Sequence, residues 1–200
     1  MDTPASGAAP RRLVLLAPDD AGFAARDLPL VAAARAAGLS VTVVTRVDAQ
    51  RGAIEAAGAR VVPFALGTAR INPMAAGYAA GQLAGILKAL DADLLHAIGL
   101  RAIVVGGTAA ALSGIAARIY QPHDLAALNA RTDAAGRLTR FGLRQALRGP
   151  LATRSTRYLC ATPAEAAALG LDPADTALAL AGADGLAAAA GTLYRAFARA

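Results

Sequence analysis

The stretch RLVLLAPDDAGFAARDLPLVAAARAAGLSVTVV, residues 12–44, decides the fold class of this 200-residue chain. It opens with a continuous apolar run at 12–18, which is typical of a strand buried on both faces of a sheet. A polar loop with one glycine is expected at 19–27, and an Ala-rich helix over 28–38 ends at Gly38. A second apolar and β-branched run covers 39–46. Strand, helix and strand in this order predict a parallel βαβ unit.

The rest of the chain repeats this alternation. Further strands are expected at 59–66, 93–99, 118–122, 157–162 and 176–184. Further helices are expected at 49–58, 71–93, 100–117, 136–148, 162–170 and 186–200. The sequence therefore predicts an α/β fold with a single Rossmann-like, doubly wound parallel sheet over residues 12–185. We expect a disordered tail at 1–11 and a C-terminal helix at 186–200 that packs back on the sheet.

Composition argues against several classes of protein. A single cysteine, Cys160, excludes an internal disulfide and a cysteine-based metal site, and its apolar surroundings in the sequence indicate a core residue. The longest apolar window, residues 102–117, is shorter than the ~20 residues of a membrane-spanning helix, and no secretory leader is visible. We therefore expect a cytoplasmic protein. The net charge of +6 favours acidic partners.

Residues that follow the predicted strands carry the candidate chemistry, because parallel sheets bind ligands at the carboxyl ends of their strands. These residues are Asp19, Asp20, Gly22, Thr45, Arg46, His96, Gly99, His123 and Asp124. No G-x-G-x-x-G follows the first strand, and two acids there would repel a pyrophosphate. The glycines within 104–114 fit helix–sheet packing better than nucleotide binding. A P-loop and a G-x-S-x-G elbow are absent, and the two histidines lack the local ligand spacing of a metal site.

Several segments resemble the N-terminal half of GT-B glycosyltransferases of the family-4 type. RDLPLVAAARAAGLSVTVV at 26–44 is similar to R-L-P-L-A-x-A-L-x-x-x-G-H-x-V in that family. DLLHAIG at 93–99 has His96 where the family has the first histidine of D-[ILV]-[IV]-H-x-H, and IYQPHDL is similar to V-x-T-x-H-D. STRYLCATPAEAAAL has Thr162 where the family has Ser, and LALAGADG looks like the stretch that ends in G-V-D. The resemblance covers residues 12–185.

The resemblance implies the acceptor-side half of a sugar-transfer enzyme. In the family, the C-terminal half binds the nucleotide sugar through an E-x(7)-E pair, which Glu55 and Glu165 do not form. We therefore expect a partner chain to supply the donor domain and its nucleotide sugar, and the isolated chain to be inactive. No cofactor and no metal are expected on this chain. The alternatives are a non-catalytic binding or scaffold subunit of the same fold and, with less support, a short nucleotide-binding oxidoreductase.

The resemblance also implies a site at the cleft between the two halves, which both histidines would face. We predict His123 as the catalytic residue. The predicted substrate-binding residues are Asp20, Gly22, Phe23, Arg46, His96, Gly99, Asp124, Arg140 and Thr162. Gly22 and its neighbours would supply backbone N–H groups to the leaving diphosphate, although the two acids depart from the glycine-rich form of the family.

A basic stretch at 136–148 carries arginines at helical spacing. Arg137, Arg140, Arg144 and Arg148 fall on one helical face, with apolar residues such as Phe141 around them. A solvated surface fits this pattern, and so does docking to an anionic membrane or to a lipid-linked phosphate acceptor. We do not expect a nucleic-acid partner, because no recognition motif accompanies the charge. From this pattern we also expect peripheral association with the inner face of the membrane.

Overall fold

The computed structural model describes residues 11–67, 73–123, 134–179 and 182–199, and one parallel sheet organises them. The strands are β1 (Arg12–Asp19), β2 (Ser40–Arg46), β3 (Arg60–Pro63), β4 (Leu94–Ile98), β5 (Ala117–Gln121), β6 (Thr156–Cys160) and β7 (Thr176–Leu178). They lie in the order β3-β2-β1-β4-β5-β6-β7, and each neighbouring pair is parallel. This topology confirms the predicted Rossmann-like fold, with the switch point between β1 and β4.

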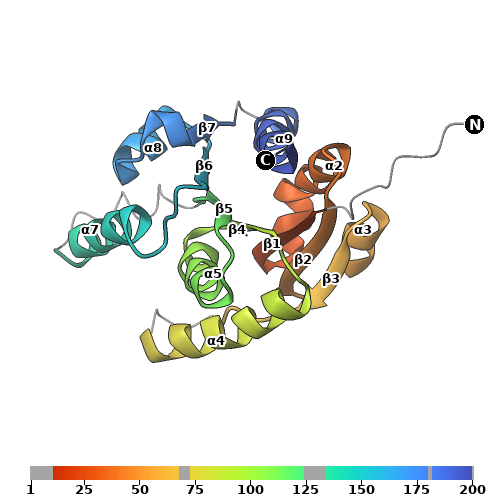
Figure 1. Ribbon diagram of the computed structural model, residues 1–200, viewed down its shortest axis with the longest axis horizontal. Coiled ribbons are helices and arrows are strands. Elements are labelled where there is room, and N and C mark those ends of the chain that lie inside the picture. The colour runs from red at the N-terminus through yellow and green to blue at the C-terminus, as the bar shows by residue number, and fades with distance from the viewer. Residues whose placement is uncertain (1–10, 68–72, 124–133, 180–181, 200) are drawn as a thin grey trace, which may run out of the picture.

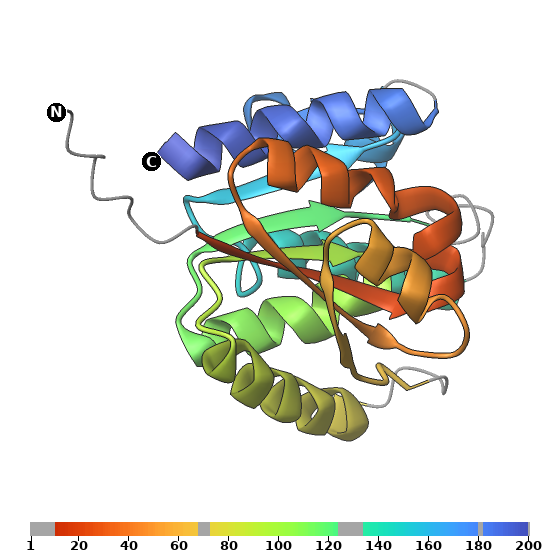
Figure 2. The same ribbon diagram turned by 90° about the vertical axis from the view of Figure 1, so that its right-hand side faces the viewer.

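Helices cover both faces of the sheet (Figure 1, Figure 2). They are α1 (Asp20–Gly22), η1 (Phe23–Asp27), α2 (Pro29–Ala36), α3 (Arg51–Ala56), α4 (Pro73–Ala89), α5 (Leu100–Ser113), α7 (Ala134–Arg148), α8 (Pro163–Leu169), η2 (Pro173–Asp175) and α9 (Ala183–Arg199). One face carries α2, α3 and α9, and the other carries α4, α5 and α7. Of the tail predicted to be disordered, residues 1–10 lie outside the described part of the chain.

The sequence of strand β1 is continuously apolar because helices cover both faces of the sheet. Successive side chains of a strand point to opposite faces. Leu13 and Leu15 pack against the α2–α9 side, whereas Val14 and Leu16 pack against the α4–α5 side. All four side chains are at most 1% exposed, so both faces of the strand are buried.

Of the stretch predicted as a polar loop, residues 19–27, all but Asp19 is helical, and Asp19 ends β1. The Oδ1 atom of Asp19 accepts the backbone N–H of Gly22 at 2.7 Å and so caps the short helix α1. The π-helix η1 continues from it towards α2 and buries Phe23 and Asp27, each 1% exposed. Short π-helical segments are frequent at functional sites. Here the π-helix η1 ends at the buried carboxylate of Asp27.

Arg118 and Tyr120 of strand β5 bury polar groups against the chain segment that follows α7. Arg118 is 4% exposed, and its guanidinium donates to the carbonyls of Ile115 and Leu151, each at 2.9 Å. The hydroxyl of Tyr120 donates to the same Leu151 carbonyl at 2.6 Å. Carbonyl oxygens thus satisfy the buried donors, as buried polar groups require. These bonds tie the segment that follows α7 to the sheet.

The paired glycines of α5 serve helix–sheet packing, which confirms the interpretation preferred from the sequence. A Cβ atom on Gly106 would lie 2.7 Å from Cδ2 of Leu16. A Cβ atom on Gly107 would lie 2.6 Å from the hydroxyl oxygen of Tyr120. Both distances are below van der Waals contact, so α5 can approach the sheet this closely only where it lacks side chains.

We expect Gly107→Ala to lower the free energy of unfolding by about 1–3 kcal/mol, the usual cost of overpacking. The new methyl group would push the Tyr120 hydroxyl away from its acceptor on Leu151. Gly81→Ala is the matched control, because nothing lies within 4 Å of its added Cβ on the exposed side of α4. The control should gain roughly 0.5–1 kcal/mol from helix propensity. Urea unfolding followed by circular dichroism measures both, and equal stabilities would contradict the packing role.

Candidate functional site

A buried carboxylate organises the carboxyl edge of the sheet. Asp27, at the end of η1, is 1% exposed and accepts a hydrogen bond from Nε2 of Gln121 at 3.0 Å. Nε2 of His123 lies 3.3 Å from the same Oδ1 atom and 2.8 Å from Nε2 of Gln121. Residues from the ends of η1 and β5, far apart in the sequence, therefore form one polar cluster. We call Asp27, Gln121 and His123 the edge cluster.

The edge cluster offers His123 two hydrogen-bonding states. The contact with Asp27 suits a proton on Nε2, which leaves Nδ1 free to accept a proton. The contact with the amide nitrogen of Gln121 suits a proton on Nδ1, with Nε2 as the acceptor. The side chain of His123 is 26% exposed, whereas that of Asp27 is 1% exposed. The arrangement therefore places an imidazole that solvent can reach against a buried carboxylate.

His96 is completely buried, so the expectation that it faces the cleft as a substrate-binding residue is corrected. Its Nδ1 atom lies 2.7 Å from the hydroxyl of Tyr194, and the two rings meet edge to face. Burial lowers the pKa of His96 to about 3, although Asp27 acts in the opposite direction. Burial also raises the pKa of Tyr194 well above its usual value, so its hydroxyl keeps its proton. Which of the two groups donates in their hydrogen bond depends on the tautomer of His96. His96 thus anchors α9 to β4.

The site residues predicted in the first loop, Asp20, Gly22 and Phe23, make contacts within the protein that stabilise this segment. Asp20 is fully buried and accepts the backbone N–H groups of Asp48 at 3.0 Å and Gln50 at 2.7 Å. Burial would raise the pKa of Asp20, but these backbone bonds outweigh it and lower the pKa. The N–H of Gly22 is already bonded to Asp19, and Phe23 lies in the core. The structure therefore corrects the expectation that these residues offer groups to a substrate.

The remaining predicted residues divide between the site and the scaffold. Arg46 forms an exposed ion pair with Asp48 at 3.0 Å. Gly99 precedes α5 with φ of 88° and donates its N–H to the carbonyl of Gln121 at 2.8 Å. Thr162 caps α8, where its hydroxyl oxygen accepts the N–H of Glu165 at 3.2 Å. Asp124 and the side chain of Arg140 lie outside the described residues.

A pocket of about 270 Å³ opens beside the edge cluster. Of the residues predicted from the sequence, His123 and Thr162 line it. Sequence reasoning missed Arg26, Asp27 and Gln121, which line it as well. Two signals were available for these residues: a charged pair stands immediately before the first long helix, and a glutamine ends a buried strand two positions before the histidine.

Cys160 contributes to the wall of this pocket without offering a nucleophile. It is 0% exposed, which confirms the prediction of a core residue. Burial raises the pKa of its thiol to about 12, with a smaller effect of Glu165 in the same direction. The reactive thiolate is therefore not populated near neutral pH.

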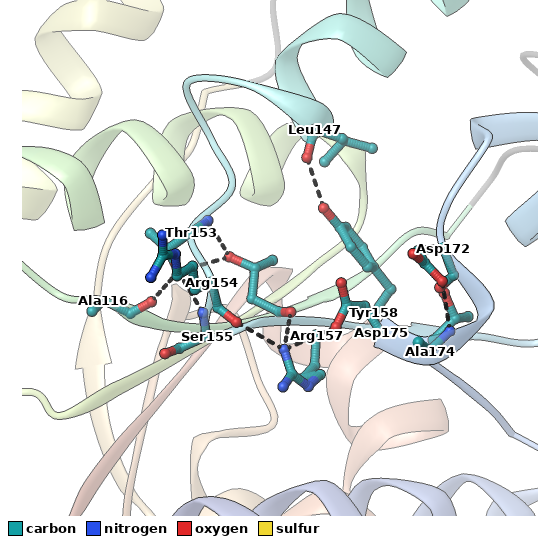
Figure 3. A network of polar contacts seen from close by, with 12 residues as sticks. Ala116, Leu147, Thr153, Arg154, Ser155, Arg157, Tyr158, Asp172, Ala174 and Asp175 are labelled. Atoms are coloured by element: carbon teal, nitrogen blue, oxygen red, sulfur yellow. Dashed lines mark hydrogen bonds and ion pairs between the residues drawn. The ribbon is translucent and has the colours of Figure 1, made fainter.

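A larger hollow, of about 540 Å³, lies at the opposite edge of the sheet, where β6 begins. Figure 3 shows the polar network there. The hydroxyl of Thr153 donates to the carbonyl of Ala116 at 2.6 Å, and Arg157 pairs with Asp175 at 3.1 Å. These bonds connect chain segments to one another, and the hollow lies away from the carboxyl edge where parallel sheets bind ligands. We assign the network a structural role.

The basic face of α7 is partly engaged by the fold. Arg144 donates to the carbonyl of Ala168 at 2.7 Å, and Arg148 donates to the carbonyl of Gly170, so both arginines satisfy the end of α8. Phe141 on the same helix is 60% exposed. Docking of α7 to an anionic membrane or a lipid-linked acceptor stays a prediction, as does the cytoplasmic location.

The described part of the chain has neither a cluster of metal ligands nor a membrane-spanning helix. Within residues 11–67, 73–123, 134–179 and 182–199, no three His, Cys, Asp or Glu side chains are grouped so that they could hold a metal ion. None of the described helices combines the length and apolar character needed to cross a bilayer.

Comparison with known proteins identifies the family. A family model described as "Glycosyl transferase 4-like domain" matches residues 21–181. The comparison with curated proteins gave no match.

Solved structures share the fold at low sequence identity. A glycosyltransferase from Rickettsia africae has a TM-score of 0.62 and 10% identity, over 86% of this chain and 43% of that one. MurG from Acinetobacter baumannii has a TM-score of 0.51 and 16% identity, over 77% of this chain and 42% of that one. A sucrose-phosphate synthase structure from Thermosynechococcus elongatus has a TM-score of 0.59 and 14% identity, over 93% of this chain and 98% of that one. The chain thus spans less than half the length of the first two proteins.

The burial of His96 predicts a pH-dependent stability. Its pKa is about 3 in the folded chain and 6.5 in the unfolded one, so between these values only the unfolded chain binds this proton. The free energy of unfolding therefore falls as pH drops below 6.5, by up to about 1.4 kcal/mol per pH unit. We expect His96→Gln, which does not titrate, to show a shallower loss between pH 6.5 and 4.5. Urea unfolding at both pH values measures this, and parallel losses in the two proteins would argue against it.

Proposed function

This chain belongs to the glycosyl transferase 4-like domain family, and from this premise we propose that it forms the acceptor side of a sugar-transfer cleft. The observation that carries the proposal is the edge cluster, where His123 meets the buried carboxylate of Asp27 beside a pocket of about 270 Å³. The cluster lies at the carboxyl edge of the sheet, where doubly wound folds bind their ligands. A general base and a neighbouring pocket are what an acceptor hydroxyl needs in order to react.

The proposed step uses the accessible nitrogen of His123. With a proton on Nε2 facing Asp27, Nδ1 takes the proton of the acceptor hydroxyl as the oxygen bonds to the anomeric carbon of the donor. The bond from that carbon to the diphosphate breaks, and the nucleoside diphosphate leaves with the electron pair. Asp27 stabilises the imidazolium that forms, and Gln121 holds the carboxylate in place.

Arg26 is the candidate cation for the leaving diphosphate. It is exposed at the mouth of the pocket, and it has no hydrogen-bond or ion-pair partner among the described residues. A positive group placed where negative charge develops stabilises the transition state. In the proposed cleft, this guanidinium would face the diphosphate of a donor that is bound by the other half.

The proposal requires a second half that holds the nucleotide sugar. Transfer needs donor and acceptor together in a cleft that excludes water, and a single sheet provides one wall of such a cleft. We propose that a donor-domain subunit supplies the other wall and brings the nucleotide sugar as co-substrate. Without it, the chain would bind an acceptor and transfer nothing.

Calorimetry of the purified chain tests the proposed division of labour. We expect UDP-, GDP- and ADP-sugars to give no saturable heat, because the edge cluster and its pocket provide acceptor contacts only. NAD⁺ and NADP⁺ should also fail to bind, since the first strand is followed by a capped helix whose Gly22 N–H is already bonded. Tight binding of a nucleotide sugar would contradict the acceptor-side role, and binding of NAD(P)⁺ alone would contradict the transferase proposal.

Substitution of the edge cluster tests the chemical step in the assembled enzyme, this chain with its donor subunit. We expect His123→Ala to lower kcat by roughly 10²–10⁴-fold with little change in KM, the usual loss on removing a general base. Asp27→Asn should also lower kcat, because an amide does not stabilise an imidazolium. Arg51→Ala is the control, since Arg51 pairs with Glu55 on the exposed side of α3 and should change the rate by less than about twofold. An unchanged kcat in His123→Ala would exclude it as the base.

A further inference from the structure

The pocket beside the edge cluster is uneven in its chemistry. Asp27, Gln121 and His123 are joined by short contacts and so lie together in one part of the wall. Much of the remaining wall is apolar and comes from β6, the residue after β7 and the first turns of α9, including Leu159, Ala179 and Leu186. The pocket therefore offers one polar end and one apolar body.

This asymmetry disfavours a bare sugar or another polyol as the occupant. Such molecules carry hydroxyls around their whole perimeter, and each one buried without a partner costs free energy. Outside the edge cluster, the polar side chains of the wall are Arg26, which is exposed at the mouth of the pocket, and Thr162, whose hydroxyl oxygen accepts the N–H of Glu165 as the cap of α8. No Phe, Tyr or Trp of the described residues lines the pocket, so a sugar face would lack the stacking surface that these side chains provide.

We infer that the pocket takes the apolar body of an alcohol- or phenol-type acceptor whose hydroxyl lies at His123. This substrate class rests on the proposed function, which supplies the reason for a hydroxyl at that position. The volume of about 270 Å³ lies just below the range of pockets for drug-sized ligands. It suits one ring or a short alkyl chain. Burial of the apolar body supplies affinity, and the edge cluster orients the hydroxyl.

A series of straight-chain alcohols from ethanol to octanol tests the inference on the purified chain, with no nucleotide sugar present. Dissociation constants come from the shifts of the His123 ring signals in NMR titrations. We expect binding to tighten about fourfold for each added methylene group until the pocket is full, and then to level off. Glucose and glycerol should leave the His123 signals unchanged.

Two matched substitutions locate the binding site. Ala179→Leu adds volume inside the pocket, so the series should level off at a shorter alcohol and octanol should bind at least about tenfold more weakly. Ala188→Leu makes the same change on the exposed side of α9 and should leave the series unaltered. If Ala179→Leu does not fold, Ala161→Leu, at an exposed residue of the same wall, takes its place.

The outcomes separate this inference from the proposed function. A flat alcohol series, binding of neither class, or equal effects of Ala179→Leu and Ala188→Leu would overturn the inference. Glucose binding at His123 without alcohol binding would overturn the substrate class and leave sugar transfer intact. A graded alcohol series together with NAD(P)⁺ binding in calorimetry would uphold the pocket assignment and overturn the transferase proposal.

Discussion

A buried carboxylate must have partners, and the carboxylate of Asp27 is 1% exposed at the edge of the sheet. Gln121 donates to it, and the imidazole of His123 lies against it. These contacts join the segment after β1 to the end of β5 across the switch point of the fold. The hydrogen bonds of this one carboxylate therefore constrain the π-helix η1, the side chain of Gln121 and the position of His123.

The two histidines differ in how deeply they are buried, and this difference decides what each can contact. His96 is 0% exposed, and burial holds its pKa near 3, so it remains neutral and binds the hydroxyl of Tyr194. The side chain of His123 is 26% exposed and lies 3.3 Å from the carboxylate of Asp27, so it can be reached from solvent. Their sequence contexts are alike, since each follows a short apolar run. The packing of α9 over β4 buries the first histidine, whereas the second lines an open pocket.

The sequence predicted the sheet well because a strand buried on both faces leaves a continuous apolar run. It also predicted the packing glycines of α5, because small residues are what a close approach of helix and sheet requires. The stretch at 19–27 was predicted wrongly as a loop, because its helical form depends on the cap by Asp19 and on the burial of both ends of η1. Asp27 and Gln121 escaped notice because their pairing spans 94 positions of the chain, and no local pattern encodes it.

The bond between Tyr194 and His96 also bears on how the protein is made. β4 lies at the centre of the sheet, yet the hydroxyl that bonds Nδ1 of its buried imidazole is 98 positions further along the chain. During synthesis the ribosome releases β1 to β5 long before α9, and until then the face that α9 covers is open to water. This face of the sheet therefore cannot complete its packing until Tyr194 has been synthesised.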